Sequence, residues 1–254
     1  MQSTTTLSNL IAPLPGSPGR PLLTYYDDAT GERTDLTAAA LGGWAVRTAG
    51  LLRDGCRLTA GDRAAVLLPP HWQTAAVLLG AWSVGVAVSF RLWATAGLAP
   101  VGPGADEPLE AVFVARRRLD SWLEVVPQGR HRFVLGLDPH GAPSADVPAG
   151  YLDYLGEVSR FPDHLPAPRP PRHTDPASPD GTTYQQWETL ARGIADSLNL
   201  RPGDRLLVDV AENEEPLKWL LTPLLGGASV VLCANLDRAR LDARIAAEGV
   251  THVL

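Results

Sequence analysis

Two stretches of the sequence share one order of features, and this internal repeat restricts the fold more than any other property of the chain. Each stretch has a helical pattern, a Gly-Asp-Arg turn, a short apolar strand, a second helix, a glycine and another strand. The turns are Gly61-Asp62-Arg63 and Gly203-Asp204-Arg205, which lie 142 residues apart. Strand–helix–strand units with apolar, β-branched strands indicate right-handed crossovers and mostly parallel sheets covered by helices. The repeat therefore predicts an α/β fold with two related lobes.

The spacing of apolar residues predicts the individual elements. Helices are expected where apolar residues recur every three or four positions, and strands where short apolar runs are bounded by turn residues. Asp27-Asp28-Ala29-Thr30-Gly31 follows the first expected strand and indicates a hairpin. The expected helices are 37–52 (capped by Thr37), 71–84, 184–198 and 214–225, and the expected strands are 22–26, 64–68, 86–90, 111–115, 133–137, 206–210, 228–232 and 251–254.

Each residue of the Gly-Asp-Arg turn has an expected structural role. The glycine can adopt a positive φ as the chain leaves the helix, and the aspartate can accept hydrogen bonds from backbone amides ahead of it. The arginine then begins the strand, and its charged guanidinium is expected to face the solvent. A ligand role for Arg63 or Arg205 is the alternative.

The composition of the segments predicts the domain organisation. Residues 1–20 are expected to be a flexible N-terminus, 21–159 a first α/β lobe, 160–179 a proline-rich connection and 180–254 a second, truncated lobe. An open sheet edge in that second lobe would need a cover, so a homodimer or a protein partner is expected there.

Charge and cysteine usage exclude several classes of function. The net charge of −6 argues against a nucleic-acid partner, and the run Arg116–Arg118 is expected to be a solvated helix face rather than a phosphate grip. Cys56 and Cys233 have neither zinc-site spacing nor a clustered histidine, which suits a reducing compartment. The N-terminus lacks a signal-peptide pattern, and the longest apolar stretch, 74–90, is too short and interrupted to span a membrane. A soluble, cytoplasmic protein without a membrane partner is expected.

The sequence lacks three common catalytic and nucleotide-binding motifs. The sequence has no G-x-S-x-G elbow, no G-x-G-x-x-G after a strand and no H-E-x-x-H, so neither catalytic nor metal-binding residues are expected. His71 and Trp72 lie just past the carboxyl end of an expected strand, where α/β sheets place ligands. A capping or packing role for this pair is favoured over a binding role.

The repeat carries a resemblance to a known family. The series T-D-L-T-A-A-A-L, A-G-D-R-A-A-V-L-L-P and L-L-G-A-W-S-V-G-V-A-V resembles the N-terminal part of adenylate-forming enzymes, which include acyl- and aryl-CoA synthetases, luciferases and adenylation domains. The later series P-G-D-R-L-L-V, L-L-G-G-A-S-V-V-L and V-T-H-V-L resembles the stretch after that family's phosphate loop. The resemblance covers most of 22–254 through scaffold positions and implies the two-lobed N-terminal part of that fold, as a short, uncharacterised branch of the family.

The family's phosphate loop, of the S-G-T-T-G-x-P-K-G type, is altered here. Its place holds Ser178-Pro179-Asp180-Gly181-Thr182-Thr183-Tyr184, in which Gly181, Thr182 and Thr183 are a remnant of the phosphate site. The second glycine and the lysine are absent, and Asp180 adds a negative charge. Lys218, the one lysine of the chain, falls inside a later expected helix.

Further family elements are missing after the strand 206–210. Where the family commonly has an aromatic residue or histidine, this chain has Asp209, Glu212, Asn213, Glu214 and Glu215. These acids are expected to complement a helix dipole and would repel a triphosphate or an acid substrate. A cleft formed by His71, Trp72, Asp209, Glu212 and Asn213 is the alternative site.

The resemblance also implies what the chain lacks. The sequence stops on an expected strand, before the family's Y-G-x-T-E segment, ribose-binding aspartate and C-terminal domain with its catalytic lysine. The hypothesis is therefore a degenerate, non-catalytic binding or interaction module without a cofactor. One alternative is a weak or partner-completed AMP-forming acid–thiol ligase that binds ATP or AMP. The other is a sensor for an acyl or aromatic acid.

Overall fold

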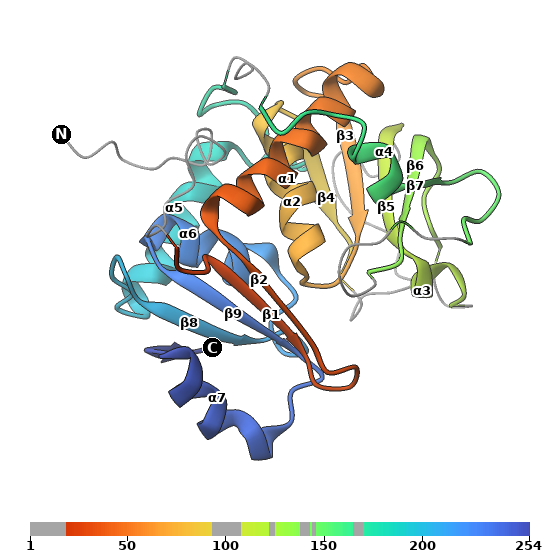
Figure 1. Cartoon of the computed structure of the whole chain (residues 1–254). Coiled ribbons are helices and arrows are strands. Elements are labelled where there is room, and N and C mark those ends of the chain that lie inside the picture. The colour runs from red at the N-terminus through yellow and green to blue at the C-terminus, as the bar shows by residue number, and fades with distance from the viewer. Residues whose placement is uncertain (1–18, 93–107, 122–124, 138–142, 144–145, 165–169) are drawn as a thin grey trace.

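Two five-stranded sheets form the framework of the chain (Figure 1). The computed structural model describes residues 19–92, 108–121, 125–137, 143, 146–164 and 170–254. One sheet is parallel throughout and has the order β4-β3-β5-β6-β7: β3 Arg63–Leu67, β4 Ala87–Phe90, β5 Leu109–Ala115, β6 Gly129–Leu135 and β7 Leu152–Asp153. The other has the order β10-β8-β9-β1-β2: β1 Leu23–Asp27, β2 Glu32–Leu36, β8 Arg205–Asp209, β9 Ser229–Ala234 and β10 His252–Val253. The predicted α/β class is confirmed.

The helices pack on and between these sheets. In Figure 1, α1 and α2 lie between the two sheets, whereas α7 covers the far face of the sheet that contains β8 and β9. Buried apolar residues from both lobes form one continuous cluster, so the lobes share a core. The helical segments are α1 Ala38–Gly50, the π-helix η2 Leu51–Gly55, α2 Trp72–Ser83, α3 Arg116–Leu119, α4 Tyr154–Val158, α5 Tyr184–Ser197, the π-helix η5 Leu217–Leu221, α6 Thr222–Gly226, the 3-10 helix η6 Arg238–Arg240 and α7 Leu241–Glu248.

The N-terminal hairpin differs from the sequence-based division of the chain. Residues 21–159 were expected to form the first lobe, yet β1 and β2 belong to the sheet of the second lobe. β1 pairs with β9 in parallel, with Leu23 opposite Val230 and Tyr25 opposite Leu232. A parallel neighbour so distant in sequence leaves no local signal, which is why the hairpin was assigned to the wrong sheet. Residues 1–18 of the expected flexible N-terminus, and residues 165–169 of the expected connection, lie outside the described residues.

The two Gly-Asp-Arg turns have the expected backbone. Gly61 and Gly203 have φ angles of +94° and +95°, a region in which residues other than glycine are strained. The carboxylates of Asp62 and Asp204 each accept a hydrogen bond from the backbone N–H three residues earlier, at 2.7 Å. The predicted roles of the glycine and the aspartate are therefore confirmed.

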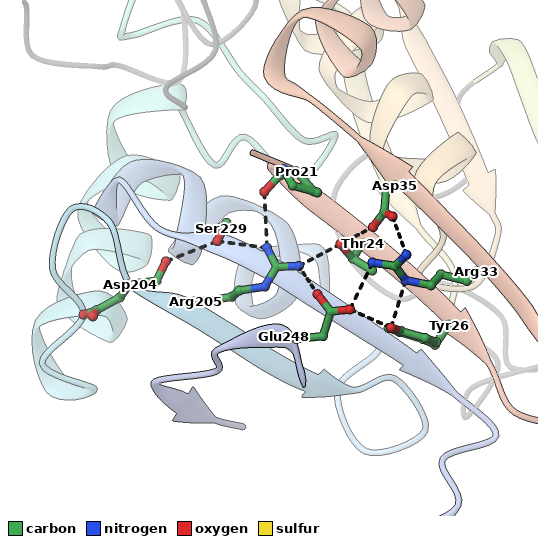
Figure 2. A network of polar contacts seen from close by, with 9 residues as sticks. All are labelled: Pro21, Thr24, Tyr26, Arg33, Asp35, Asp204, Arg205, Ser229 and Glu248. Carbon is green, nitrogen blue, oxygen red and sulfur yellow. Dashed lines mark hydrogen bonds and ion pairs between the residues drawn. The ribbon is translucent and has the colours of Figure 1, made fainter. Parts of the chain in front are cut away.

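The arginine of the second turn was predicted wrongly. Arg205 is only 4% exposed, whereas its charge was expected to lie outside. Figure 2 shows its guanidinium between Thr24 and Glu248, and it donates to Thr24 Oγ1 at 2.7 Å and to Glu248 Oε2 at 2.6 Å. Glu248 also accepts hydrogen bonds from the Tyr26 hydroxyl at 2.6 Å and from Arg33 at 3.1 Å. A buried arginine needs such partners, and all of them come from distant parts of the chain.

Three further predictions need correction. The expected helix 214–225 begins late, as η5, because Pro216 lacks an N–H and disfavours a helical conformation at the residue before it. Glu215 still lies directly before that helix, because its carbonyl accepts hydrogen bonds from the N–H groups of Lys218 and Trp219. Within the expected solvated run, Arg118 is only 2% exposed, and its guanidinium donates to the carbonyls of Arg91 and Leu92 at the end of β4. α7 was not predicted.

α1 and α2 approach each other closely at Gly80. The structure confirms Thr37 as the N-cap of α1, since its hydroxyl accepts a hydrogen bond from the N–H of Ala40 at 3.1 Å. A Cβ atom at Gly80 would lie 2.5 Å from the Cβ of Thr48 and 2.8 Å from the carbonyl oxygen of Ala45. Only glycine fits here without moving one helix away from the other.

Candidate functional site

The remnant loop before α5 is a short two-stranded turn. Pro176 and Thr183 form an isolated antiparallel bridge, and Gly181 between them has a φ of +87°. Asp180 accepts hydrogen bonds from the hydroxyl of Ser178 at 2.6 Å and from the N–H of Thr182 at 3.0 Å. The hydrogen bond from Ser178, partly opposed by burial, lowers the pKa of Asp180. The loop therefore holds an ionised carboxylate of its own among its hydroxyl and amide groups.

The start of α5 is closed by a capping box. The Thr183 hydroxyl accepts a hydrogen bond from the N–H of Gln186, and the Gln186 side chain accepts one from the N–H of Thr183 at 2.8 Å. The N–H groups of Tyr184 and Gln185 donate to the carbonyls of Asp175 and His173. The N–H groups of Gly181 and Thr182 donate to acceptors within the turn. From residue 181 to 186, every backbone N–H thus has an acceptor inside the chain.

The same loop forms hydrogen bonds that connect the two lobes. The carbonyl of Ala177 accepts hydrogen bonds from the N–H of Val88 at 2.9 Å and from the Trp82 indole at 3.2 Å. The hydroxyl of Tyr184 donates to the carbonyl of Trp82 at 2.8 Å, and both side chains are almost fully buried. We call this set of contacts the interlobe clasp. Sequence reasoning missed it, because nothing in the pattern pairs Tyr184 with a tryptophan in the first lobe.

His71 and Trp72 lie at the start of α2, at the carboxyl end of β3. The Nδ1 atom of His71 accepts a hydrogen bond from the N–H of Gln73 at 3.2 Å and so caps the helix. The His71 ring meets Tyr25 edge-on, with 4.4 Å between ring centroids, and Trp72 packs on Trp44 at 5.5 Å. The favoured capping and packing role of this pair is confirmed.

Burial keeps His71 neutral. Burial, with a smaller contribution from the charge of Arg117, lowers the pKa of His71 from 6.5 to about 3. In the unfolded chain, the imidazole takes up a proton near pH 6.5, so acid favours the unfolded state in this pH range.

We therefore expect His71 to contribute to acid sensitivity. The neutral, buried His71 imidazole contributes its full stabilisation above pH 6.5, and this contribution is lost as the pH falls towards 3. Between pH 7 and pH 5, this one group should lower the free energy of unfolding by about 2 kcal/mol. Urea unfolding across this range would measure the effect, with His71→Asn as the control because asparagine caps helices without titrating. An equal pH dependence in the variant would contradict the prediction.

The two acids of the expected cleft form hydrogen bonds with an arginine. Asp209 and Glu212 both accept hydrogen bonds from the guanidinium of Arg238, at 3.1 and 2.7 Å. Asn213 donates weakly to the carbonyl of Asp209, at 3.4 Å. Among the described residues, the hydrogen-bond and ring partners of this group do not overlap with those of His71 and Trp72. A common cleft of the two groups therefore stays a prediction.

A shallow groove of about 420 Å³ lies along α5 and was not predicted. Glu188 and Arg192, which lie in this groove, form an ion pair at 3.1 Å. Its lining consists of His173, Gln185, Glu188, Thr189 and Arg192.

Neither a metal cluster nor a membrane-spanning helix occurs in the described part of the chain. Within it, no three histidine, cysteine or carboxylate side chains come together as a metal site. No helix in the same residues has the length and apolar character needed to cross a membrane.

Comparisons with known proteins agree on the architecture. No protein-family model matches the chain. A "TIGR03089 family protein" from Mycobacterium tuberculosis (strain ATCC 25618 / H37Rv) is 36% identical over 261 residues, which cover 100% of both chains.

Three solved structures with this fold are longer proteins. An acyl-CoA synthetase from Brucella canis superposes with a TM-score of 0.74 at 18% identity, over 98% of this chain and 47% of its own. Acetoacetyl-CoA synthetase from Streptomyces lividans gives a TM-score of 0.72 at 18% identity, over 98% of this chain and 42% of its own. The anthranilate CoA ligase AuaEII, in complex with anthranoyl-AMP, gives 0.64 at 14% identity, over 96% and 48%. The chain thus spans about half the length of these proteins.

Proposed function

Since the chain belongs to the TIGR03089 family and has the fold of the N-terminal domain of adenylate-forming enzymes, we propose that it is a non-catalytic binding or interaction module on that scaffold. The observation that carries this proposal is the state of the remnant loop. Every backbone N–H from residue 181 to 186 already has an acceptor within the chain.

A phosphate at this loop would lack free backbone N–H donors. Helix N-termini and glycine-rich loops bind phosphate because their N–H groups point at the ligand and lack other partners. Here the capping box and the turn use those groups, and the carboxylate of Asp180 repels an incoming anion. Lys218 lies within η5, outside this loop. ATP binding through the loop would therefore require several internal hydrogen bonds to break.

The two lobes share their strand arrangement and the residues that support it, rather than a set of catalytic residues. We infer an internal duplication, since β3, β4 and β5 are arranged in one sheet as β8, β9 and β10 are in the other. The pairing also agrees, with Arg63 opposite Ala87 and Arg205 opposite Ser229. The positions that are identical between the lobes are the Gly-Asp-Arg turns, one further glycine, and apolar residues of strands and helices, which supports retention of the fold.

ATP–pyrophosphate exchange tests the proposal. With a panel of acyl and aromatic acids, the purified protein should give no exchange above the background, while an active acyl-CoA synthetase assayed in parallel gives a clear signal. The physical reason is that the triphosphate finds neither free amide donors nor a lysine at the loop.

A matched pair of variants makes the assay decisive. Thr182→Ala alters the remnant loop, and Thr189→Ala alters an exposed threonine on α5. Exchange that is abolished by the first substitution and kept by the second would overturn the proposal. It would favour instead an AMP-forming acid–thiol ligase with ATP bound at the remnant loop.

A further inference from the structure

The N-cap residue and the first two residues of α2 bury side-chain polar atoms that have no hydrogen-bond partner in the described part of the chain. The atoms are Nε2 of His71, Nε1 of Trp72, and both Oε1 and Nε2 of Gln73. Their residues are 1%, 3% and 0% exposed, and none of these atoms has a hydrogen-bond partner among the residues that the structure describes. Most buried polar side-chain atoms in proteins are hydrogen-bonded, so four unpaired atoms in three consecutive residues need an explanation.

Their position in the fold is one where α/β proteins bind ligands. β3 lies between β4 and β5, and the chain leaves β3 towards β4 on one side, whereas it leaves β5 towards β6 on the other. Ligands of open α/β sheets bind outside the carboxyl ends of strands at such a switch point. The hairpin of the other sheet closes this position, because Tyr25 meets His71 edge-on at 4.4 Å. The unpaired atoms therefore lie where the start of α2 meets the hairpin, and we call this contact between the two lobes the seam.

The donor and acceptor roles of the unpaired atoms specify which groups a ligand would need in order to pair with them. Because Nδ1 of His71 accepts the N–H of Gln73, the ring proton is on Nε2, which is a donor. The Trp72 indole is a second donor, and the Gln73 amide supplies one donor group and one acceptor. All three side chains are neutral, and Tyr25, Trp44 and Trp72 supply aromatic surface around them.

We propose that this seam is a closed ligand site for a small, uncharged, planar ring that carries a carbonyl next to an N–H, as in an aromatic carboxamide or a lactam. The carbonyl accepts from His71 and Trp72, the ligand N–H donates to the Gln73 oxygen, and the ring packs on the aromatic side chains. Entry requires Tyr25 and the hairpin to move away from α2, since the unpaired atoms have no accessible surface. The inference deepens the proposed binding role but concerns atoms outside the remnant loop, so pyrophosphate exchange and ligand binding can fail independently.

Benzamide and benzoate are the matched probes. Benzamide has the required carbonyl and N–H, whereas benzoate is an anion of the same shape that leaves the Gln73 oxygen without a donor. Benzamide should raise the melting temperature of the full chain in a dose-dependent way, and benzoate should not. No shift with benzamide, or equal shifts with both probes, would overturn the proposal.

Variants at two glutamines locate the site. Gln73→Met replaces the unpaired amide by an apolar side chain of similar size, and Gln185→Met does the same at an exposed position on α5. We expect Gln73→Met to melt at least as high as the wild type and to weaken benzamide binding tenfold or more. Gln185→Met should bind benzamide normally. A Gln73→Met protein that melts lower than the wild type, or binds benzamide normally, would contradict the assignment.

Hydrogen exchange on the unmodified chain provides a test that does not depend on any variant. Benzamide should slow amide exchange in the hairpin, residues 23–36, and at the start of α2, residues 71–76, because it bridges these two elements. Slowing that is confined to other parts of the chain would overturn the proposal.

Discussion

Glu248→Ala should lower the free energy of unfolding by about 4 kcal/mol, because it leaves the buried Arg205 guanidinium without its carboxylate partner. The side chains of both residues are less than one-tenth exposed, and their ion pair is 2.6 Å long. Tyr26 and Arg33 lose the same acceptor. Urea unfolding would show the loss as a lower midpoint at an unchanged slope.

Two comparisons test whether burial is the cause. Glu188→Ala removes the glutamate of the more exposed pair with Arg192 and should cost less than about 1 kcal/mol. The double variant Arg205→Met, Glu248→Ala removes both charges, so it should be more stable than Glu248→Ala alone. A double variant that loses the sum of the two single effects would show that the two side chains do not interact.

Gly80→Ala should cost about 3 kcal/mol, because the added methyl group enters the contact between α1 and α2. It would meet the Cβ of Thr48 at 2.5 Å and the carbonyl of Ala45 at 2.8 Å, and neither is the end of a flexible side chain. The greater helix propensity of alanine offsets the clash only in part. Thermal unfolding would measure the loss.

Gly193 supplies the matched control in α5. A Cβ atom at this exposed helical position would meet nothing within 4 Å, so Gly193→Ala should stabilise the protein by about 0.5 to 1 kcal/mol. Equal effects of the two substitutions would show that the approach of α1 to α2 does not limit the size of residue 80.

The predictable part of the fold is local. The turn glycines, the caps at Thr37 and His71, and most strands follow from short apolar runs and from residues with special backbone or capping properties. α7 was missed although Leu241 and Ile245 keep helical spacing and Gly249 closes the helix in the left-handed region. Its short length and weak periodicity made the pattern inconspicuous beside the longer helices.

The remainder depends on contacts between distant residues. The burial of Arg205 requires Thr24 and Glu248, which lie 181 and 43 residues away. The assignment of Gly181–Thr183 as a remnant phosphate site stays a prediction from resemblance. The structure adds that these residues form a capped turn whose amides are in use. Neither the partners of Arg205 nor the occupied amides leave a periodic pattern in the sequence.

The interlobe clasp has a consequence for protein engineering. Tyr184 and Ala177 would have to be released from Trp82 before the loop could wrap around a phosphate, and both contacts are buried. Introducing a lysine or a second glycine alone would leave both contacts to Trp82 in place. A designer who wants a nucleotide-binding version of this chain should first stabilise the protein elsewhere, for example with Gly193→Ala in α5, and only then rebuild residues 178–184 together.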